Sequence, residues 1–241
     1  MDEGKYVATT NSNLISQCRP VEVAIDATGV PDVGAKVATD AINNKKHVVM
    51  LNVETDVVIG PLLDKMAKDN GVIYTGSAGD EPGAVMELYD FATAMGLEVK
   101  VMGKGKNNRI DKNCNPDTVL EEATRRKMSP KMLCAFKDGT KTMVEMTAMS
   151  NATGLVPDVI GGHGIASDVK SLNETYKLKE DGGILKQHGV VEYVNGIAPG
   201  VFVTVATDNE EIAYQMQYHS MGPGPLWTLY RPYHLCNLEL R

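Results

Sequence analysis

The sequence lacks the patterns that mark membrane spans, secretion and cysteine-bound metal. No window approaches 18 uninterrupted apolar residues, and residues 1–5 lack the apolar core of a signal peptide. The four cysteines, at positions 18, 114, 134 and 236, form no C-x-x-C pair. We therefore expect a cytoplasmic protein with reduced thiols and no membrane partner.

Positive charge is also scarce. The chain has 24 Lys and Arg residues against 31 Asp and Glu residues, a net charge of -7. Nucleic-acid surfaces depend on dense Lys/Arg patches, so nucleic acid is not expected as a partner. The five histidines form no H-E-x-x-H spacing, and no metal ligands are predicted, although the sequence leaves a metal requirement open.

The dinucleotide-binding fingerprint G-x-G-x-x-G is missing as well. Its glycines let the backbone approach a pyrophosphate at a helix N-terminus. Residues 103–108 (Gly-Lys-Gly-Lys-Asn-Asn) fail at the third glycine. Because the chain begins with a loop instead of a strand, we expect the first strand–helix–strand portion of a Rossmann domain to lie upstream of it.

Strand-like and helix-like segments alternate over the first hundred residues. Strands are predicted at 21–25, 47–51, 72–75 and 97–102, and helices at 31–42, 61–70 and in a long segment ending at 95. This alternation implies a parallel sheet whose strands end at one common edge. Four loops are expected to converge there, at 27–29, 52–54, 77–83 and 103–108.

The stretch 103–108 is the centre of the predicted site. It directly follows an apolar strand and places two ammonium groups and two carboxamides on backbone loosened by glycine. Such a loop suits an anionic, hydroxylated small molecule at a sheet edge. A solvated basic turn is the alternative interpretation.

After residue 115 the pattern changes. Helices are predicted at 116–126, from 130 and at 140–153, strands at 190–195 and 200–207 joined as a hairpin by 196–199, and a helix at 209–219. The predicted fold class is α/β. A partial Rossmann-type parallel sheet in residues 1–101 is followed by an α+β catalytic and oligomerisation domain in residues 102–241.

Carboxylates supply further candidate site residues. Asp80 and Glu81 precede a helix and could orient a substrate hydroxyl or bind a metal, although acidic residues also favour first turns because of the helix dipole. Glu145 lies in a methionine-rich helix and needs a partner, for which Lys104 and Lys106 are the candidates.

Two polar positions have open interpretations. Asn151 is either a polar group of the site or part of a polar signal that stops its helix. Thr28, followed by Gly29 after the first strand, either contacts a nicotinamide or ribose or forms an ordinary turn.

Several motifs carry a resemblance to known enzymes. Residues 26–31 (Asp-Ala-Thr-Gly-Val-Pro) and 47–54 (His-Val-Val-Met-Leu-Asn-Val-Glu) resemble the second half of the NAD-binding domain of homoserine dehydrogenases. Later segments are similar to the deoxyxylulose-phosphate reductoisomerase-like branch of that family: 79–83, 103–108, 138–142, 145–146, 150–154 and 230–235. The similarity spans nearly the whole chain.

The resemblance implies a fold and an activity. Members of the branch have an NAD(P)-binding Rossmann domain, a central catalytic and oligomerisation domain, and usually a C-terminal SAF domain, before which this chain would stop. They transfer hydride from the reduced form of NADP or NAD to a phosphorylated, sugar-like carbonyl compound such as deoxyxylulose phosphate, in isoprenoid precursor biosynthesis. The expected partners are a small-molecule substrate and further copies of the chain in a homo-oligomer.

The resemblance also implies roles for residues. Lys104 and Lys106, with Glu145, would be catalytic, the lysines binding phosphate or polarising the carbonyl. Substrate hydroxyls would be held by Asn107 and Asn108, and the polar positions noted above, Asp80, Glu81 and Asn151, are further predicted substrate-binding residues. The cofactor would contact Ala27, Thr28, Gly29, Asn52, Val53 and Glu54.

Two alternative functions stay open. One is homoserine oxidation, although the Asn-Lys pair of homoserine dehydrogenases is replaced by Asn-Val-Glu at 52–54. The other is a non-catalytic oligomerisation fragment, in which the methionine-rich helices and the hairpin form an interface between subunits.

Overall fold

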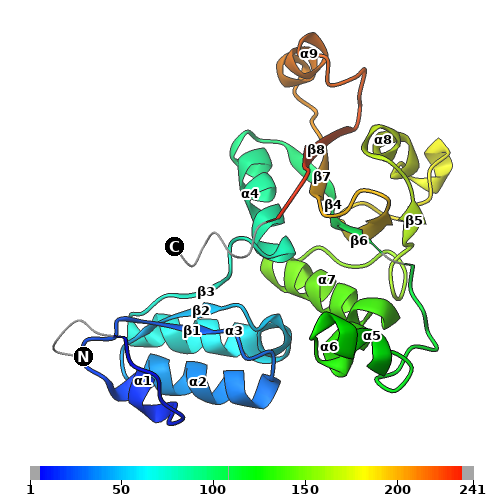
Figure 1. Cartoon of the computed structure of the whole chain (residues 1–241). Coiled ribbons are helices and arrows are strands. Elements are labelled where there is room, and N and C mark those ends of the chain that lie inside the picture. The colour runs from blue at the N-terminus through cyan, green and yellow to red at the C-terminus, as the bar shows by residue number, and fades with distance from the viewer. Residues whose placement is uncertain (1–5, 108, 235–241) are drawn as a thin grey trace. The chain divides into compact units, whose positions relative to one another are not determined.

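A computed structural model describes residues 6–107 and 109–234. The chain divides into two compact units, one ending at Ser77 and the other beginning at Ala78 (Figure 1). Residue 101, the last residue of the predicted first domain, belongs to the second unit. The assignment of cofactor binding and catalysis to separate domains stays a prediction.

The first unit is a parallel sheet covered by helices. Its three strands lie in the order β1-β2-β3, with every pair parallel. The strands and helices are α1 (Asn13–Gln17), β1 (Val23–Asp26), α2 (Pro31–Asn43), β2 (His47–Met50), α3 (Val53–Asn70) and β3 (Tyr74–Gly76). The predicted strand–helix alternation and the parallel sheet are confirmed.

The core of this unit lies on one face of the sheet. Val48 and Met50 of β2 pack against small and aliphatic side chains of α2 and α3, including Ile42 and Leu63. The continuous apolar run of β2 is typical of a parallel strand that is buried on both faces. It instead alternates, with His47 and Val49 partly exposed.

Helix α3 begins eight residues before the predicted start at Pro61. Asn52 caps it by accepting a hydrogen bond from the amide of Thr55, and Pro61 lies inside the helix. The predicted loop at 52–54 is therefore wrong, because these residues form the cap and first turn of α3.

The second unit is built on a mixed five-stranded sheet. The strand order is β5-β6-β4-β7-β8, in which β4 is parallel to β6 and antiparallel to β7. The strands are β4 (Glu98–Lys106), β5 (Ile165–Ala166), β6 (Val190–Asn195), β7 (Val201–Ala206) and β8 (Trp227–Arg231). Together with the first unit this confirms the predicted α/β fold class.

Strand β4 does not extend the first sheet, so the predicted convergence of four loops on one edge is wrong. The strand also continues through Lys106, and 103–106 is not a loop. The glycines are explained by close packing: a Cβ on Gly103 would lie 2.0 Å from the carbonyl oxygen of Glu192, and one on Gly105 would lie 2.3 Å from the amide nitrogen of Ala198.

The predicted hairpin between β6 and β7 is wrong for the same reason. β4 lies between these two strands, so 196–200 connects them across the end of β4. The amide of Gly105 donates to the carbonyl of Gly200 at 2.8 Å along this crossing. Two alternating segments separated by a short glycine-containing link thus do not pair with each other.

Helices surround this sheet. α4 and α7 contact β4 and each other, and α5 and α6 contact one another beside α7 (Figure 1). The helices are α4 (Glu81–Ala94), α5 (Leu120–Arg126), α6 (Pro130–Asp138), α7 (Thr140–Thr153), α8 (Leu172–Thr175) and α9 (Glu210–Tyr218), with short 3-10 helices η1 (Val169–Ser171) and η2 (Lys179–Asp181). Among the described residues, no helix combines the length and apolar content needed to cross a membrane.

Candidate active site

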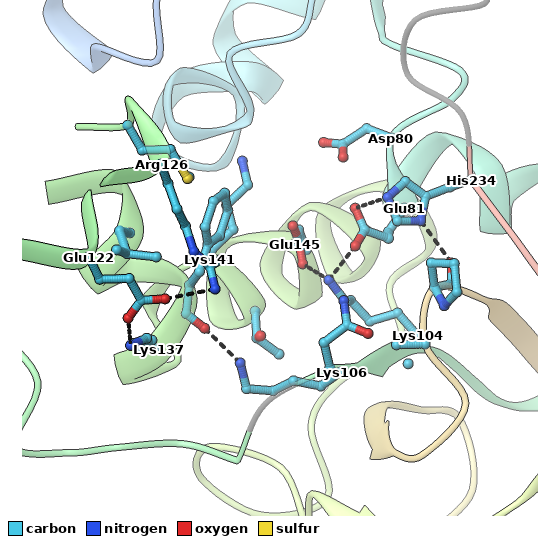
Figure 2. Close-up of a pocket in the computed structure, with 18 residues that line it drawn as sticks. Asp80, Glu81, Lys104, Lys106, Glu122, Arg126, Lys137, Lys141, Glu145 and His234 are labelled. Carbon is cyan, nitrogen blue, oxygen red and sulfur yellow. Dashed lines mark hydrogen bonds and ion pairs between the residues drawn. The ribbon is translucent and has the colours of Figure 1, made fainter. Parts of the chain in front are cut away.

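A cavity of about 610 Å³ lies within the second unit. Its walls come from the N-terminus of α4, the end of β4, α5, α6 and the first half of α7 (Figure 2). These elements are far apart in the sequence and meet because α4 and α7 both pack on β4. The cavity therefore collects side chains that no local motif contains.

Lys104 is the buried centre of one wall. Its side chain extends from β4, and the residue is only 6% exposed. Its ammonium donates to Glu81 Oε1 at 2.6 Å, at the start of α4, and also to Glu145 Oε2 on α7. The predicted pairing of Glu145 with a lysine of β4 is present.

Two further groups flank this ion pair. Asp80 is the residue before α4, and its carboxylate lies with those of Glu81 and Glu145 so that oxygens of all three are within 4.8 Å of one another. His234 Nε2 lies 3.6 Å from Glu81 Oε2. Three carboxylates at this spacing are also a donor set for a divalent cation, which would have to displace Lys104 from two of them.

The three carboxyl groups differ in their affinity for a proton. Although burial opposes ionisation of Glu81, the ammonium of Lys104 lowers the pKa of this carboxyl to about 2. Burial raises the pKa of Glu145 to about 7 despite Lys104, and burial together with Glu81 raises the pKa of Asp80 to about 6. One ammonium neutralises one carboxylate, and the further carboxyl groups in the same low-dielectric site give up their protons at a higher pH than usual.

Ionisation of Lys104 is favoured in this setting. Burial alone would lower the pKa of its ammonium, but Glu145 and Glu81 outweigh it and raise the pKa. Near neutral pH the wall thus holds a fixed ammonium beside a carboxyl group that can give up a proton. These are the groups that stabilise and protonate a developing alkoxide.

The opposite wall is cationic. Lys106 donates to the carbonyl oxygen of Phe136 at 2.9 Å, and burial and Lys104 lower the pKa of its ammonium. Glu122 Oε1 lies 2.8 Å from Arg126 Nη2, and Glu122 Oε2 accepts from Lys137. Lys141 and Asn107 also line the cavity.

The structure gathers most of the predicted substrate-site residues. Six of them line the cavity: Asp80, Glu81, Lys104, Lys106, Asn107 and Glu145. Asn151 is exposed near the end of α7 and does not line it. Asn108 lies outside the described residues.

Sequence reasoning missed the cationic side chains of the helices and His234. Arg126 and Lys137 occupy last turns, where basic residues are common because of the helix dipole, so neither stood out. Lys141 belongs to the segment 138–142, which was noted only for its resemblance to the reductoisomerase-like branch. His234 belongs to no metal-binding spacing, so the sequence did not single it out.

The predicted cofactor residues lie in the first unit, at the carboxyl ends of β1 and β2. Ala27 and Thr28 are exposed, and Gly29 has a left-handed φ of 64°. Asn52 is only 1% exposed, and its amide nitrogen is within hydrogen-bond distance of Asp26, Thr28 and the carbonyl of Val30. Val53 is also buried, and Glu54 is half-buried in the first turn of α3.

Comparison with known families identifies the second unit. Residues 79–240 match the family described as oxidoreductase DRL, catalytic domain. The chain belongs to this oxidoreductase DRL family. The predicted oxidoreductase family is thus confirmed, and the cavity lies within the matched catalytic domain.

Solved structures give distant similarities. A protein of Archaeoglobus fulgidus assigned as a homoserine dehydrogenase is 20% identical, with 58% of this chain and 46% of that chain covered and a TM-score of 0.41. A protein of Thermotoga maritima assigned as a dehydrogenase is 10% identical (81% and 57% covered, TM-score 0.42). Homoserine dehydrogenase of S. aureus is 20% identical (40% and 30% covered, TM-score 0.29).

These sequence identities and TM-scores are too low to indicate a substrate or a cofactor for this chain. The chain spans 31%, 30% and 46% of the length of the first three structures that match it. No curated protein matches the chain closely enough to count as a relative.

Proposed function

We propose that this DRL-family protein is an NAD(P)-dependent oxidoreductase that reduces the carbonyl group of a small phosphorylated or polar substrate, with deoxyxylulose phosphate as the first candidate. The observation that carries the proposal is the buried ammonium of Lys104, held by Glu81 and Glu145 at one end of a cavity with a cationic opposite wall. A preorganised ammonium in a dry site stabilises the charge that develops on a carbonyl oxygen.

The chemistry requires a hydride, which a nicotinamide cofactor supplies to the carbonyl carbon when bound. The carbonyl π electrons move to oxygen, and the ammonium of Lys104 stabilises the resulting alkoxide. The alkoxide then takes a proton from Lys104 or, through it, from the carboxyl group of Glu145, so that the product is an alcohol. Glu81 stays ionised and keeps Lys104 in place.

The first unit offers a partial fit for the cofactor. Ala27 and Thr28 are exposed after β1, where ligands of parallel sheets bind, so a ring or ribose has access to them. Asn52 and Val53 are buried, and we assign their side chains to the structure of the unit and not to cofactor contact. Glu54 and Gly29 remain candidate contacts.

Oxidation of homoserine is the competing proposal. Homoserine carries its own ammonium group and only one carboxylate, so it matches a cationic wall less well than a phosphate ester does. Assaying the protein on homoserine with NADP and on deoxyxylulose phosphate with NADPH, in parallel, separates the two. Turnover of homoserine alone would overturn the proposed substrate class.

Lys104→Ala tests the role of the ammonium. We expect turnover to fall by about a hundredfold or more, the usual cost of losing an oxyanion-stabilising group, while the affinity for NADPH changes little. Lys100→Ala is the matched control, since Lys100 lies on the same strand and pairs with exposed Glu98 outside the cavity. Unchanged turnover of the Lys104 variant would remove this lysine from the chemistry.

Calorimetric titration with NADPH tests the remaining alternative, a non-catalytic oligomerisation fragment. Binding of NADPH with micromolar affinity would contradict a purely structural role. The expected homo-oligomer, the cytoplasmic location and a place in isoprenoid precursor biosynthesis stay predictions.

A further inference from the structure

The cavity is divided into two walls of opposite character (Figure 2). Around Lys104 the lining is rich in carboxyl groups: Asp80, Glu81 and Glu145. The other wall carries four cations and one carboxylate: Lys106, Arg126, Lys137, Lys141 and Glu122. Lys141 also acts electrostatically on Asp80 of the first wall. Among the other described residues of the second wall, three cations face one carboxylate, an excess of two positive charges that a bound anion would neutralise.

Glu122 occupies part of this cationic wall as an internal anion. One carboxylate oxygen faces Arg126 at 2.8 Å, and the other accepts from the ammonium of Lys137 (Figure 2). Both oxygens are thus used, and the hydrogen bond from Lys137 is the main reason that the pKa of Glu122 is lowered. A carboxylate that bridges a guanidinium and an ammonium uses the same donors that a phosphate oxygen pair uses.

We propose that Arg126 and Lys137, together with Lys106, form a subsite for the phosphate monoester of the substrate, and that Glu122 holds the two helix cations in place until the phosphate displaces it. The inference rests on the proposed function for the identity of the substrate. The binding of a phosphate group to this wall does not depend on turnover.

The geometry of the three cations supports a phosphate ligand. Arg126 and Lys137 come from α5 and α6, which contact each other, so the two charges are brought together by helix packing. Lys106 enters from β4 and donates to the backbone carbonyl oxygen of Phe136. Glu145 and Asp138 act on its charge from a distance, but among the described residues no carboxylate forms an ion pair with it, so a phosphate oxygen can approach the ammonium. A guanidinium is suited to planar, bidentate recognition, and ammonium groups bind phosphate as point charges.

The experiment is a calorimetric titration of the protein with inorganic phosphate at constant ionic strength. We expect Arg126→Ala and Lys106→Ala to weaken phosphate binding by at least about fivefold, because each removes a charge-assisted hydrogen bond. Glu122→Gln should tighten it by about three- to fivefold, since a competing ion pair of partly exposed groups is lost. Lys131→Ala is the control, because Lys131 is exposed on α6 and does not line the cavity.

The Glu122 variant makes the test specific. If Glu122 only stabilised the packing of α5 and α6, Glu122→Gln would leave the affinity for phosphate unchanged or weaken it. This result would overturn the proposal that phosphate displaces Glu122. Equal binding by wild type, Arg126→Ala and Lys106→Ala would overturn the subsite itself. The thermal midpoint of each variant is measured alongside, and Arg126→Lys, which keeps the charge, replaces Arg126→Ala if the latter unfolds.

The source of the phosphate is resolved by a second comparison. If the substrate supplies the phosphate, Glu122→Gln lowers KM for the phosphorylated substrate. The affinities for NADPH and for NADH both stay unchanged. A change in NADPH affinity without a change for NADH would assign the wall to the 2′-phosphate of the cofactor and overturn the substrate assignment. Phosphate binding that follows the expected pattern in a protein without reductase activity would contradict the proposed function only.

Discussion

The ammonium of Lys104 lies 2.6 Å from Oε1 of Glu81 in a part of the protein from which water is largely excluded. The same ammonium donates to Glu145, which is 2% exposed. A buried charge is tolerated only when it is paired, so each of these groups depends on the others for its ionisation state. The first two predictions follow from this dependence.

Replacing Lys104 with alanine should destabilise the protein in a pH-dependent way. At pH 8 the variant leaves buried carboxylates without a counter-charge, which costs about 3–5 kcal/mol when one partner of a buried pair is removed. At pH 5 the carboxyl groups can take up protons, so the loss should be clearly smaller. Urea unfolding at the two pH values measures the difference.

Lys100→Ala provides the control for this measurement. Lys100 pairs with the exposed carboxylate of Glu98 on the same strand, and such pairs contribute about 1 kcal/mol or less. An equal loss of stability for Lys104→Ala at both pH values would contradict the ionisation states assigned to Glu81 and Glu145.

Glu145→Gln should flatten the pH dependence of stability between about pH 4.5 and 7. Because burial raises the folded-state pKa of Glu145 from 4.5 to about 7, the unfolded chain releases this proton first. The native state then holds more protons than the unfolded state across this window, so the free energy of unfolding falls as pH rises. The glutamine variant cannot ionise and should lose that fall, on the order of 1.4 kcal/mol for each unit of pKa separation.

Glu121→Gln serves as the comparison, since Glu121 is exposed in the first turn of α5. Its curve of stability against pH should match that of the wild type. Asp80, whose pKa burial raises to about 6, remains in both variants and should leave a residual slope at the acidic end of the window. A Glu145→Gln curve as steep as the wild-type curve would show that Glu145 ionises at its ordinary pKa.

The glycines of β4 should be intolerant of a methyl group. An alanine at Gly103 would place its Cβ 2.0 Å from a carbonyl oxygen of β6, and the partner is backbone that cannot rotate away. We expect Gly103→Ala to cost about 3 kcal/mol or more, the upper end of overpacking penalties. Gly76→Ala is the control, because Gly76 also lies in a strand but a Cβ there would meet nothing within 4 Å. Denaturant midpoints close to wild type for both variants would count against this account of β4.

The same glycines show what the sequence can and cannot predict. The motif 103–108 indicated a site, and Lys104 and Lys106 do line the cavity. The reason given was wrong, because the glycines were interpreted as loosening a loop, whereas they permit the close approach of β6 and of 196–200 to strand β4. The sequence shows that a glycine has no side chain. Only the tertiary structure shows which neighbouring backbone fills the space that a side chain would occupy.

Sheet membership shows a second limit. The alternation of strands and helices predicted the parallel sheet of the first unit, since successive crossovers dictate it. The alternating pattern of β4 does not predict which sheet the strand joins, because the strand pairs with β6 and β7, which lie about a hundred positions later in the sequence. The cationic wall could not be predicted from the sequence for a similar reason. In the sequence Arg126 and Lys137 are typical of solvent-exposed helix residues, and only the packing of α5 against α6 brings them together at Glu122.

Asn52→Ala should separate a structural from a cofactor-binding role for this residue. The asparagine caps α3 and joins Asp26, Thr28 and the carbonyl of Val30. Losing the cap and leaving Asp26 partly unsatisfied should cost about 2–4 kcal/mol, the sum of a cap and one or two buried hydrogen bonds.

Asn43→Ala is the control for this variant, because Asn43 is exposed at the end of α2. Its free energy of unfolding in urea titrations should stay within about 0.5 kcal/mol of the wild-type value. If Asn52→Ala kept its stability but lost affinity for NADPH, the side chain would belong to a cofactor site, and its burial in the first unit would have to be relieved on binding.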